Sequence, residues 1–173
     1  MQVKIKKFHP DAVIPTYATP DSAGFDLVAV EETIIEPGET VKIPLGLAFE
    51  IPRGYVFLLC MRSGIAIHTA LRLPNGVGVI DSDYRGEVSM IFENSFPEND
   101  IATSPPFRID GSPEDIRLEQ YDFGTYIIRK GDRVAQGIIT PVIQASFVKV
   151  DELSDTKRGT GGFGSTGVRS NEK

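Results

Sequence analysis

The sequence predicts an all-β domain, built as a sandwich, a barrel or a jelly roll, and two observations carry this prediction. The segment 41–51 has an apolar side chain at every odd position, a period of two that is typical of a half-buried strand. Short apolar runs then recur along the chain, each bounded by Gly, Pro, Asn or Asp. Many short strands separated by turn residues are typical of all-β folds.

Turn residues divide the chain into strands in a regular order. The signals are Pro-Gly at 37–38, Pro-Arg-Gly at 52–54, Pro-Asn-Gly at 74–76 and Lys-Gly-Asp at 130–132. Further strands are predicted at 55–59, 77–80, 88–92, 125–128, 134–139 and 147–150. One short helix is expected from Ser63 to Thr69, with Ser63 as its N-cap.

Residues 94–124 break this order. The segment contains Pro97, Pro105, Pro106 and Pro113, and prolines interrupt strand ladders. We therefore expect an insertion in the domain. Loops of this length are uncommon in compact domains and are usually functional or disordered. Two interpretations stay open: a surface loop without a role, and a segment that binds a regulatory partner protein.

Composition and charge limit the possible functions. The chain has 173 residues, 40% of them hydrophobic and 24% charged, which fits one domain over residues 1–150 followed by an arm, 151–173. The formal net charge of −6 argues against a nucleic-acid polymer as partner. No apolar stretch approaches the roughly twenty residues that span a bilayer, so we expect a cytoplasmic protein. Cys60 is the only cysteine and is expected to be a buried free thiol.

The glycine-rich segment 158–167 suits a mobile strap that closes over a flat ring with an anionic tail. Its five glycines let backbone N–H groups approach phosphate oxygens. Arg158 adds a planar charged fork, and Phe163 offers a face for stacking. The segment therefore indicates a nucleoside polyphosphate. A disordered tail of low-complexity composition is the alternative.

Two other segments carry residues suited to catalysis or anion binding. Asp81 and Asp83 lie in a turn between two apolar runs, where a carboxylate could act as a general base, although such aspartates often serve only the turn itself. Arg62 precedes the expected helix, whose start could receive an anion. The chain has no P-loop and no nucleophile elbow, and its two histidines lack metal-ligand spacing. Ordinary NTPases, serine hydrolases and zinc sites are disfavoured.

Five segments, in order and spacing, make the chain resemble the homotrimeric deoxyuridine triphosphatases (dUTPases). They are Ala-Gly-Phe-Asp-Leu at 23–27, Arg-Ser-Gly-Ile-Ala at 62–66, the stretch 78–88, Gly-Asp-Arg-Val-Ala-Gln at 131–136, and 158–167. The resemblance implies a distorted β jelly roll with one short helix. It also implies a homotrimer with active sites between subunits, each closed by the C-terminal arm of a neighbouring subunit.

The resemblance implies a reaction, the hydrolysis of dUTP to dUMP and pyrophosphate, which keeps uracil out of DNA and supplies dUMP for dTMP synthesis. Asp81 matches the general base that activates water for attack on the α-phosphorus. Mg²⁺ is implied as cofactor, held chiefly by phosphate oxygens, with Asp26 as a partner through metal-bound water. The substrate contacts implied are Arg62, Ser63, Gly64, Asn75, Gly78, Val79, Ile80, Tyr84, Gln136, Arg158, Phe163, Gly164, Ser165 and Thr166.

The same positions are expected to select the substrate. In the family a β-hairpin presents main-chain groups to the uracil edge, and the segment Leu73–Ile80 occupies that place, with Asn75 as a helper. Tyr84 is expected to pack under the sugar and exclude a 2′-hydroxyl. Phe163 is expected to cover the base.

The chain departs from the family pattern at two places, and two alternatives stay open. Met61 stands where proline is common, and the insertion at 94–124 resembles that of the longer dUTPases of phages of Gram-positive bacteria. One alternative is a dUTP-binding regulator that acts through the insertion. The other is dCTP deaminase, which shares the fold; its third motif carries a tryptophan, and this chain has none.

Overall fold

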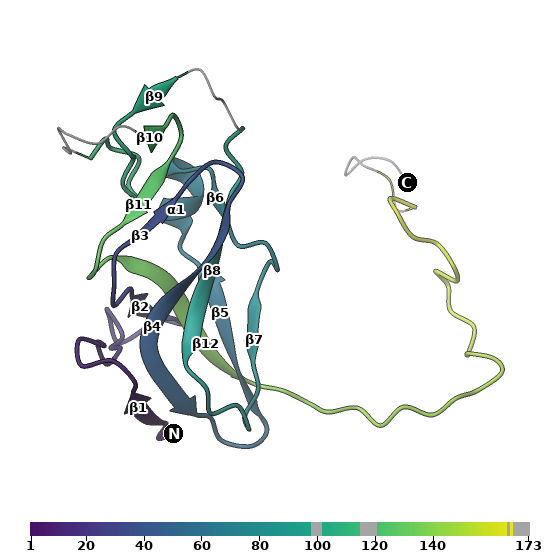
Figure 1. Cartoon of the computed structure of the whole chain (residues 1–173). Helices are drawn as coiled ribbons and strands as arrows, with labels where there is room; N and C mark the ends of the chain where they lie inside the picture. Colours follow the sequence, from purple (N-terminus) through teal and green to yellow (C-terminus); the bar gives the residue numbers. More distant parts are fainter. Residues whose placement is uncertain (98–101, 115–120, 166, 168–173) are drawn as a thin grey trace. The chain divides into compact units, whose positions relative to one another are not determined.

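Short antiparallel strands make up most of the regular structure, in agreement with the all-β prediction. The computed structural model describes residues 1–97, 102–114, 121–165 and 167, and it divides into two units, Met1–Ile143 and Gln144–Lys173. The elements, labelled in Figure 1, are β1 (Lys4–Lys7), β2 (Phe25–Val28), β3 (Thr33–Ile35), β4 (Thr40–Glu50), β5 (Tyr55–Met61), α1 (Ser63–His68), β6 (Leu71–Arg72), β7 (Gly78–Ile80), β8 (Val88–Asn94), β9 (Thr103–Ser104), β10 (Tyr121–Asp122), β11 (Tyr126–Ile128) and β12 (Arg133–Pro141).

The first unit contains two four-stranded sheets and two two-stranded ones, β3-β11 and β9-β10. One four-stranded sheet has the order β1-β4-β8-β6 and the other β2-β12-β5-β7, with antiparallel pairing throughout. Phe49 of β4 contacts Phe57 of β5, with ring centroids 4.9 Å apart, and Phe25 of β2 lies 5.6 Å from Phe57. These rings join the two sheets, so the core is that of a two-layer β structure.

Strand β4 does not alternate over its whole length, although the sequence predicted that it would. Its register against β8 shifts between Pro44 and Leu47, which marks a β-bulge. Gly46 lies in the bulge with φ +67°, and a Cβ there would come within 2.8 Å of Ala12 and Val30. Residues 45–49 are consequently all buried. Only glycine fits this conformation and this space.

The outer face of the second sheet combines apolar and polar side chains. Cross-strand partners share a face, and Gln136 of β12 lies opposite both Asp26 of β2 and Cys60 of β5. Further along the same face, Leu58 lies opposite both Ile138 and Val79 of β7. The apolar side chains here are half-buried or exposed, so in a single chain this face is incompletely covered.

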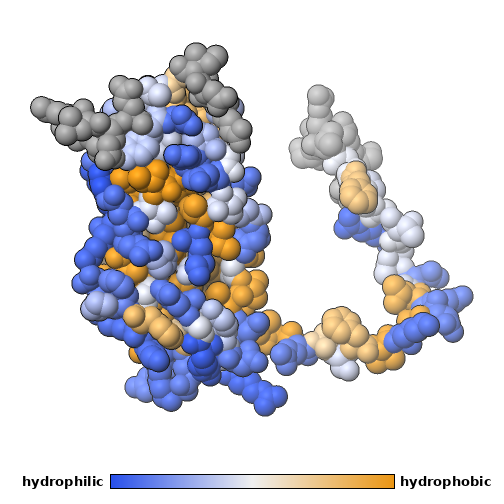
Figure 2. All heavy atoms as spheres, viewed as in Figure 1, coloured by the Kyte–Doolittle hydropathy of each residue, from blue (hydrophilic) through white to orange (hydrophobic). Residues whose placement is uncertain are grey.

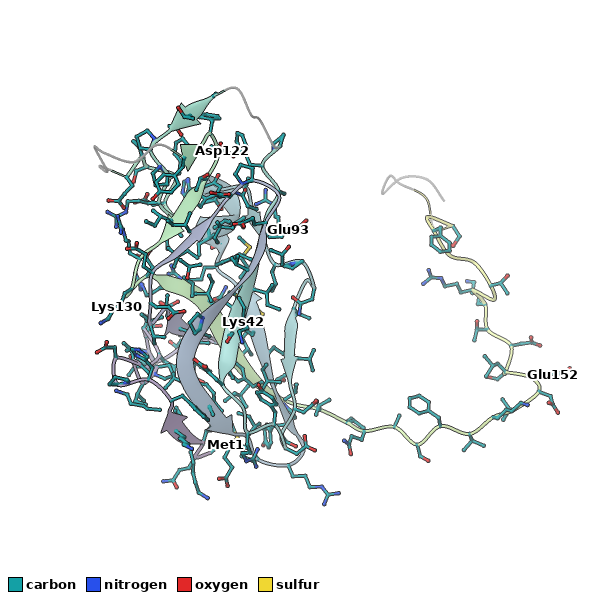
Figure 3. All side chains as sticks on the ribbon, in the orientation of Figure 1. Met1, Lys42, Glu93, Asp122, Lys130 and Glu152 are labelled. Carbon is teal, nitrogen blue, oxygen red and sulfur yellow. The ribbon has the colours of Figure 1, made fainter. Side chains whose placement is uncertain are left out.

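The insertion packs on the rest of the first unit through aromatic rings and ion pairs. Phe107 contacts Tyr126 of β11, with ring centroids 6.2 Å apart, and also meets Phe123 edge to face. Arg129 pairs with Glu32 in the body and with Glu114 in the insertion; these carboxylates raise the pKa of Arg129 above its ordinary value. Strands β9 and β10 pair with each other near Asp122, which is labelled in Figure 3. The described part of the insertion is therefore an ordered substructure.

Several sequence predictions need correction. Residues 147–150 form no strand, because the described part of the second unit offers no strand for them to pair with. Figure 2 shows hydrophobic and hydrophilic residues interspersed along the arm, and Phe147 is 93% exposed. The helix begins at Ser63 and has Arg62 at the N-cap position with no side-chain cap bond, so Ser63 is not the cap. Cys60 is only partly buried, because it lies on the incompletely covered face.

Short elements escaped the sequence predictions as well. Strands β1, β2, β3, β6, β9 and β10 were not predicted, and β1 in particular consists mainly of lysines. Among the described residues no helix has the length and apolar character to cross a membrane.

Candidate active site

Arg62, Ser63 and Gly64 lie where β5 ends and α1 begins. The half-buried Arg62 points its guanidinium toward β2 and β12, while Ser63 and Gly64 are exposed. A Cβ on Gly64 would meet no atom within 4 Å, so open space lies in front of this backbone. The segment can therefore offer backbone N–H groups, a hydroxyl and a guanidinium to an anion.

Asp26 binds two arginines at once. Its Oδ1 accepts from Nε of Arg62 at 2.9 Å, and its Oδ2 accepts from Nη1 of Arg133 at 3.0 Å. Nη1 of Arg62 also reaches the main-chain oxygen of Arg133 at 3.4 Å. The three side chains form a charged cluster with excess positive charge.

A β-bulge in β12 places Arg133 in this cluster. The register against β2 shifts between Arg133 and Ala135, so Arg133 lies opposite Val28 while Gln136 lies opposite Asp26. In a regular strand residues 133 and 136 would point to opposite faces. The extra residue brings both to the face that carries Asp26. Arg133 was not singled out from the sequence, because bulges leave no signal in a hydrophobic pattern.

Gln136 lies beside the cluster. Its Nε2 donates to the main-chain oxygen of Met61 at 3.1 Å, which ties β12 to the residue just before Arg62. The predicted phosphate-binding residues Arg62, Ser63, Gly64 and Gln136 are thus brought together at one end of the β2-β12-β5 sheet, with Asp26 among them.

Segment 73–80 differs from the expected β-hairpin. Strand β6 pairs with β8 and β7 pairs with β5, so the two strands lie in different sheets. The turn between them contains the exposed Asn75, and Gly76 has φ +71°. Gly78 packs tightly on β5, because a Cβ there would lie 3.0 Å from that of Leu59. Val79 is exposed and lies next to Ile80 at the end of β7.

Asp81 and Tyr84 lie in the loop between β7 and β8. Asp81 is exposed, and its main-chain oxygen accepts the N–H of Tyr84 at 3.1 Å, which closes a turn. The Tyr84 hydroxyl donates to the main-chain oxygen of Glu87 at 3.1 Å. Glu87 in turn accepts the N–H of Gly46 at 2.8 Å through its side chain. Glu87 was not singled out from the sequence, because its partner is 41 residues away in the chain.

One chain does not bring Asp81 close to Arg62. Ile80 lies opposite Phe57, five residues before Arg62 on β5, a separation of about 16 Å at a rise of about 3.3 Å per residue. Because β7 is antiparallel to β5, the chain moves further from Arg62 as it enters the Asp81 loop. The predicted base and the predicted phosphate-binding residues therefore lie at different places on the molecule.

The arm carries a series of tight turns within its own unit. Nε of Arg158 donates to the main-chain oxygen of Gly161 at 2.8 Å, and the N–H of Gly161 donates to that of Arg158 at 3.1 Å. Phe163 is fully exposed with φ +46°, and Gly164 has φ +91°. The N–H of Ser165 donates to Gly162. Thr166, another predicted contact, lies outside the described residues.

No group of three or more His, Cys, Asp or Glu within the described ranges could hold a metal ion. The described side chains at the Arg62 end are those of Arg62 and Arg133, the carboxylate of Asp26 and the amide of Gln136.

Comparison with known proteins adds to this geometry. The dUTPase family model matches residues 10–104 and 119–167, and the stretch it leaves out falls within the predicted insertion. The chain is 42% identical to the deoxyuridine 5′-triphosphate nucleotidohydrolase of Nautilia profundicola over 96% of this chain and 99% of that protein.

Two solved phage structures are also similar. The dUTPase of Staphylococcus bacteriophage 80alpha with dUPNHPP has a TM-score of 0.91 at 32% identity, covering 96% of this chain and 99% of that one. A mutant dUTPase of phage phi11 of S. aureus, described with a structural Mg(II) ion, has a TM-score of 0.84 at 29% identity, covering 90% of this chain and 100% of that one.

Proposed function

This chain belongs to the dUTPase family and hydrolyses dUTP to dUMP and pyrophosphate, and from that premise we propose how its residues divide the work. The match to the curated dUTP nucleotidohydrolase over nearly the full length of both chains carries the assignment. Like the family, the enzyme uses Mg²⁺. The alternative of a dCTP deaminase has no support in the family match.

Asp81 is the proposed general base. It is exposed in a loop whose ends are fixed by β7 and β8, so it can reach a water molecule while the loop stays in place. The oxygens of a carboxylate accept hydrogen bonds and protons, which is what a general base at this position needs. Through a hydrogen bond it orients and deprotonates the water that attacks the α-phosphorus in line, with pyrophosphate leaving.

Arg62, Ser63, Gly64 and Gln136 are the proposed phosphate-binding residues. Asp26 holds the guanidinium of Arg62 through Nε, and Nη1 reaches the main-chain oxygen of Arg133, which leaves Nη2 to meet phosphate oxygens. The open space at Gly64 lets the phosphates approach the backbone. These contacts bind and orient the triphosphate so that the α-phosphorus faces the water.

The Mg²⁺ supplies charge neutralisation at the phosphates, whose oxygens are the hard ligands that this ion prefers. Asp26 is the protein group proposed to meet it through a water molecule. Each carboxylate oxygen has a second lone pair beyond the one used by arginine, so the two arginine contacts leave room for that role.

Uracil and deoxyribose selection are proposed for the segment from Asn75 to Tyr84. Main-chain groups of Gly78, Val79 and Ile80 would meet the uracil edge, with Asn75 as a helper. Cytosine would be rejected because its amino group is a hydrogen-bond donor and would face a donor of the protein. Tyr84 would pack under the sugar and leave no space for a 2′-hydroxyl. Tyr84 is 44% exposed, as expected for a residue that packs on a ligand.

We propose that the active enzyme is a homotrimer with each site shared between subunits. The distance along β5 between Ile80 and Arg62 supports this, because one dUTP molecule must contact both places. The incompletely covered face around Leu58, Ile138 and Val79 supports it too, since such apolar faces mark protein interfaces. A second copy could bring its Asp81 loop to the Arg62 end of the first.

The arm is proposed to close the site of a neighbouring copy. Arg158, Gly164, Ser165 and Thr166 would bind the γ-phosphate end, and Phe163 would stack on uracil, a contact worth about 1–3 kcal/mol by analogy with single-strand binders. The full exposure of Phe163 and the glycine turns around it suit a segment that orders on substrate.

A second role is proposed for the insertion at 94–124, as a binding site for a regulatory protein. Its described residues form an ordered structure, held by Phe107 and Arg129, which is more than a connecting loop needs. The similar 80alpha structures are described as phage dUTPases that control transfer of virulence genes.

We also propose that the enzyme works in the cytoplasm, where deoxynucleotides are made.

Release of pyrophosphate from each deoxy and ribo nucleoside triphosphate, measured with Mg²⁺ and again with a chelator, tests the proposed function. We expect turnover of dUTP alone, and none with the chelator. Ammonia release from dCTP, or equal turnover of UTP, would contradict it.

A further inference from the structure

The side chain of Glu87 connects the active-site loop to a distant strand. Its Oε1 accepts the N–H of Gly46 at 2.8 Å in a half-buried position. Gly46 belongs to the bulge of β4, where the ladder to β8 is interrupted between Pro44 and Leu47. A bulge leaves an N–H outside the ladder, and a buried donor without an acceptor is costly. The Glu87 carboxylate supplies that acceptor.

The bulge residue is itself fixed from other sides. The main-chain oxygen of Gly46 accepts the N–H of Phe8 at 2.8 Å, and Ala12, Val30 and His9 all approach the position that a Cβ would take. Gly46 is fully enclosed, so its N–H points in a set direction. Glu87 is therefore tied to a rigid part of the domain.

The main chain of Glu87 holds Tyr84. The Tyr84 hydroxyl donates to the Glu87 oxygen at 3.1 Å, and a Cβ on Gly86 would lie 2.3 Å from that hydroxyl. The ring thus lies directly over Gly86, against the backbone of its own loop. A chain of two hydrogen bonds leads from the β4 bulge through Glu87 to Tyr84.

We propose that Glu87 is a positioning residue for Tyr84 and that, through it, the β4 bulge sets the preference of the enzyme for dUTP over UTP. The inference rests on the role proposed above for Tyr84 at the sugar. The Glu87 main-chain oxygen accepts the Tyr84 hydroxyl, so a shift of the Glu87 backbone would move the Tyr84 ring. The clash between that ring and a 2′-hydroxyl of the sugar would then change.

The bond to Gly46 needs an acceptor of the right reach. Gln at position 87 keeps a carbonyl oxygen at the same distance from the backbone, although it loses the charge. Asp keeps the charge but is one methylene shorter and falls short of the Gly46 N–H. Reach and charge can therefore be separated by two substitutions.

The test measures kcat and KM for dUTP and for UTP, by pyrophosphate release, in the full-length enzyme. In Glu87→Asp and Glu87→Ala we expect the ratio of kcat/KM for dUTP to that for UTP to fall about tenfold, as for loss of one geometry-fixing hydrogen bond. Glu87→Gln is expected to keep most of the ratio. Tyr84→Phe should lower the ratio by a similar factor, and combining it with Glu87→Ala should add little.

Glu50→Ala is the matched control. Glu50 ends the same strand β4 and its carboxylate binds Nζ of Lys4 at 2.9 Å, and the charge of Lys4 acts on it more strongly than that of Arg85 in the loop. We expect it to leave the ratio unchanged. Melting temperatures are recorded for all variants, because a purely structural role for Glu87 would lower stability and leave the ratio intact.

Two outcomes contradict the proposal in different ways. Suppose that the wild type prefers dUTP, but the ratio of kcat/KM for dUTP to that for UTP stays unchanged in Glu87→Asp and Glu87→Ala, or is not retained in Glu87→Gln. The proposed role of Glu87 is then wrong, while that of Tyr84 is unaffected. If the wild type turns over UTP as readily as dUTP, the role of Tyr84 falls and the inference falls with it. Where Glu87→Ala does not fold, the Asp and Gln variants decide.

Discussion

Asp26 illustrates how one carboxylate can arrange several charged groups. It receives Nε of Arg62 and Nη1 of Arg133 on separate oxygens, so each guanidinium is fixed from one edge. An arginine fixed in this way loses less side-chain freedom when it binds phosphate. We therefore expect the arrangement to be pre-organised for the triphosphate proposed to bind there.

The base role of Asp81 can be tested at the level of one atom. In Asp81→Asn we expect dUTP binding to remain near normal while kcat falls by about 10²–10⁴, the usual contribution of a general base. Single-turnover kinetics and binding titration with a non-hydrolysable dUTP analogue measure the two quantities.

Asp83→Asn is the control for that substitution, because Asp83 is an exposed aspartate of the same turn. It is expected to keep wild-type turnover. Normal turnover in Asp81→Asn would remove Asp81 as the base.

Gly46 allows a separate test of the bulge. Gly46→Ala is expected to destabilise the protein by about 1–3 kcal/mol, because the backbone has positive φ and a Cβ would meet Ala12 and Val30 at 2.8 Å. Urea unfolding measures the change.

Gly54→Ala provides the comparison for Gly46. Gly54 also has positive φ, +84°, but no atom lies within 4 Å of its Cβ position. Gly54→Ala is therefore expected to lower the free energy of unfolding by about 1 kcal/mol, the cost of placing alanine at a positive φ without crowding. Equal losses at the two sites would show that crowding at the bulge costs nothing.

At the scale of elements, strands with a clear apolar pattern were predictable and those defined by their partners were not. β4, β5, β8 and β12 each have several buried apolar residues in sequence. β1 has three lysines in four residues and forms only because Glu50 through Leu47 of β4 pair with it. Conversely, 147–150 has a strand pattern but is no strand in this chain.

The candidate site shows the same division. Arg62, Asp81 and Gln136 were singled out from sequence motifs, and their roles stay predictions. Arg133 and Glu87 were not, because their places depend on bulges in β12 and β4. A bulge arises from pairing between distant segments, which no local pattern contains.

The arm is the element whose removal should separate catalysis from folding. A chain that ends at residue 157 is expected to lose most of its kcat/KM for dUTP, because Arg158 and Phe163 are gone. Its melting temperature should stay within a few degrees, since the buried core is built from residues between Ala12 and Ala135. Pyrophosphate release gives kcat/KM for dUTP, and thermal unfolding gives the melting temperature.

A shorter truncation that removes only 168–173 leaves the glycine-rich segment in place and is expected to stay active. Full activity of the chain ending at residue 157 would show that the arm has no catalytic role.

At the scale of the whole molecule, a site shared between copies predicts complementation. Arg62→Ala and Asp81→Asn chains should each be nearly inactive alone. Unfolded together in equal amounts and refolded, they should regain about a quarter of wild-type activity, since random trimers of cyclic symmetry contain that share of intact sites.

Refolding each variant alone is the control for complementation. No recovery in the mixture, with trimers confirmed by light scattering, would place Arg62 and Asp81 in the same subunit's site. Monomers of full activity would contradict the trimer altogether.

The exposed segment that follows β12 has a consequence for protein synthesis. Phe147, Val148 and Val150 are exposed and pair with no strand among the described residues, so we expect a newly released polypeptide to be prone to aggregation through this segment. Lys149, Asp151 and Glu152 interrupt or directly follow this apolar run, and charges so placed act as gatekeepers against aggregation. We therefore expect the yield of folded enzyme to fall as the local concentration of newly made chains rises.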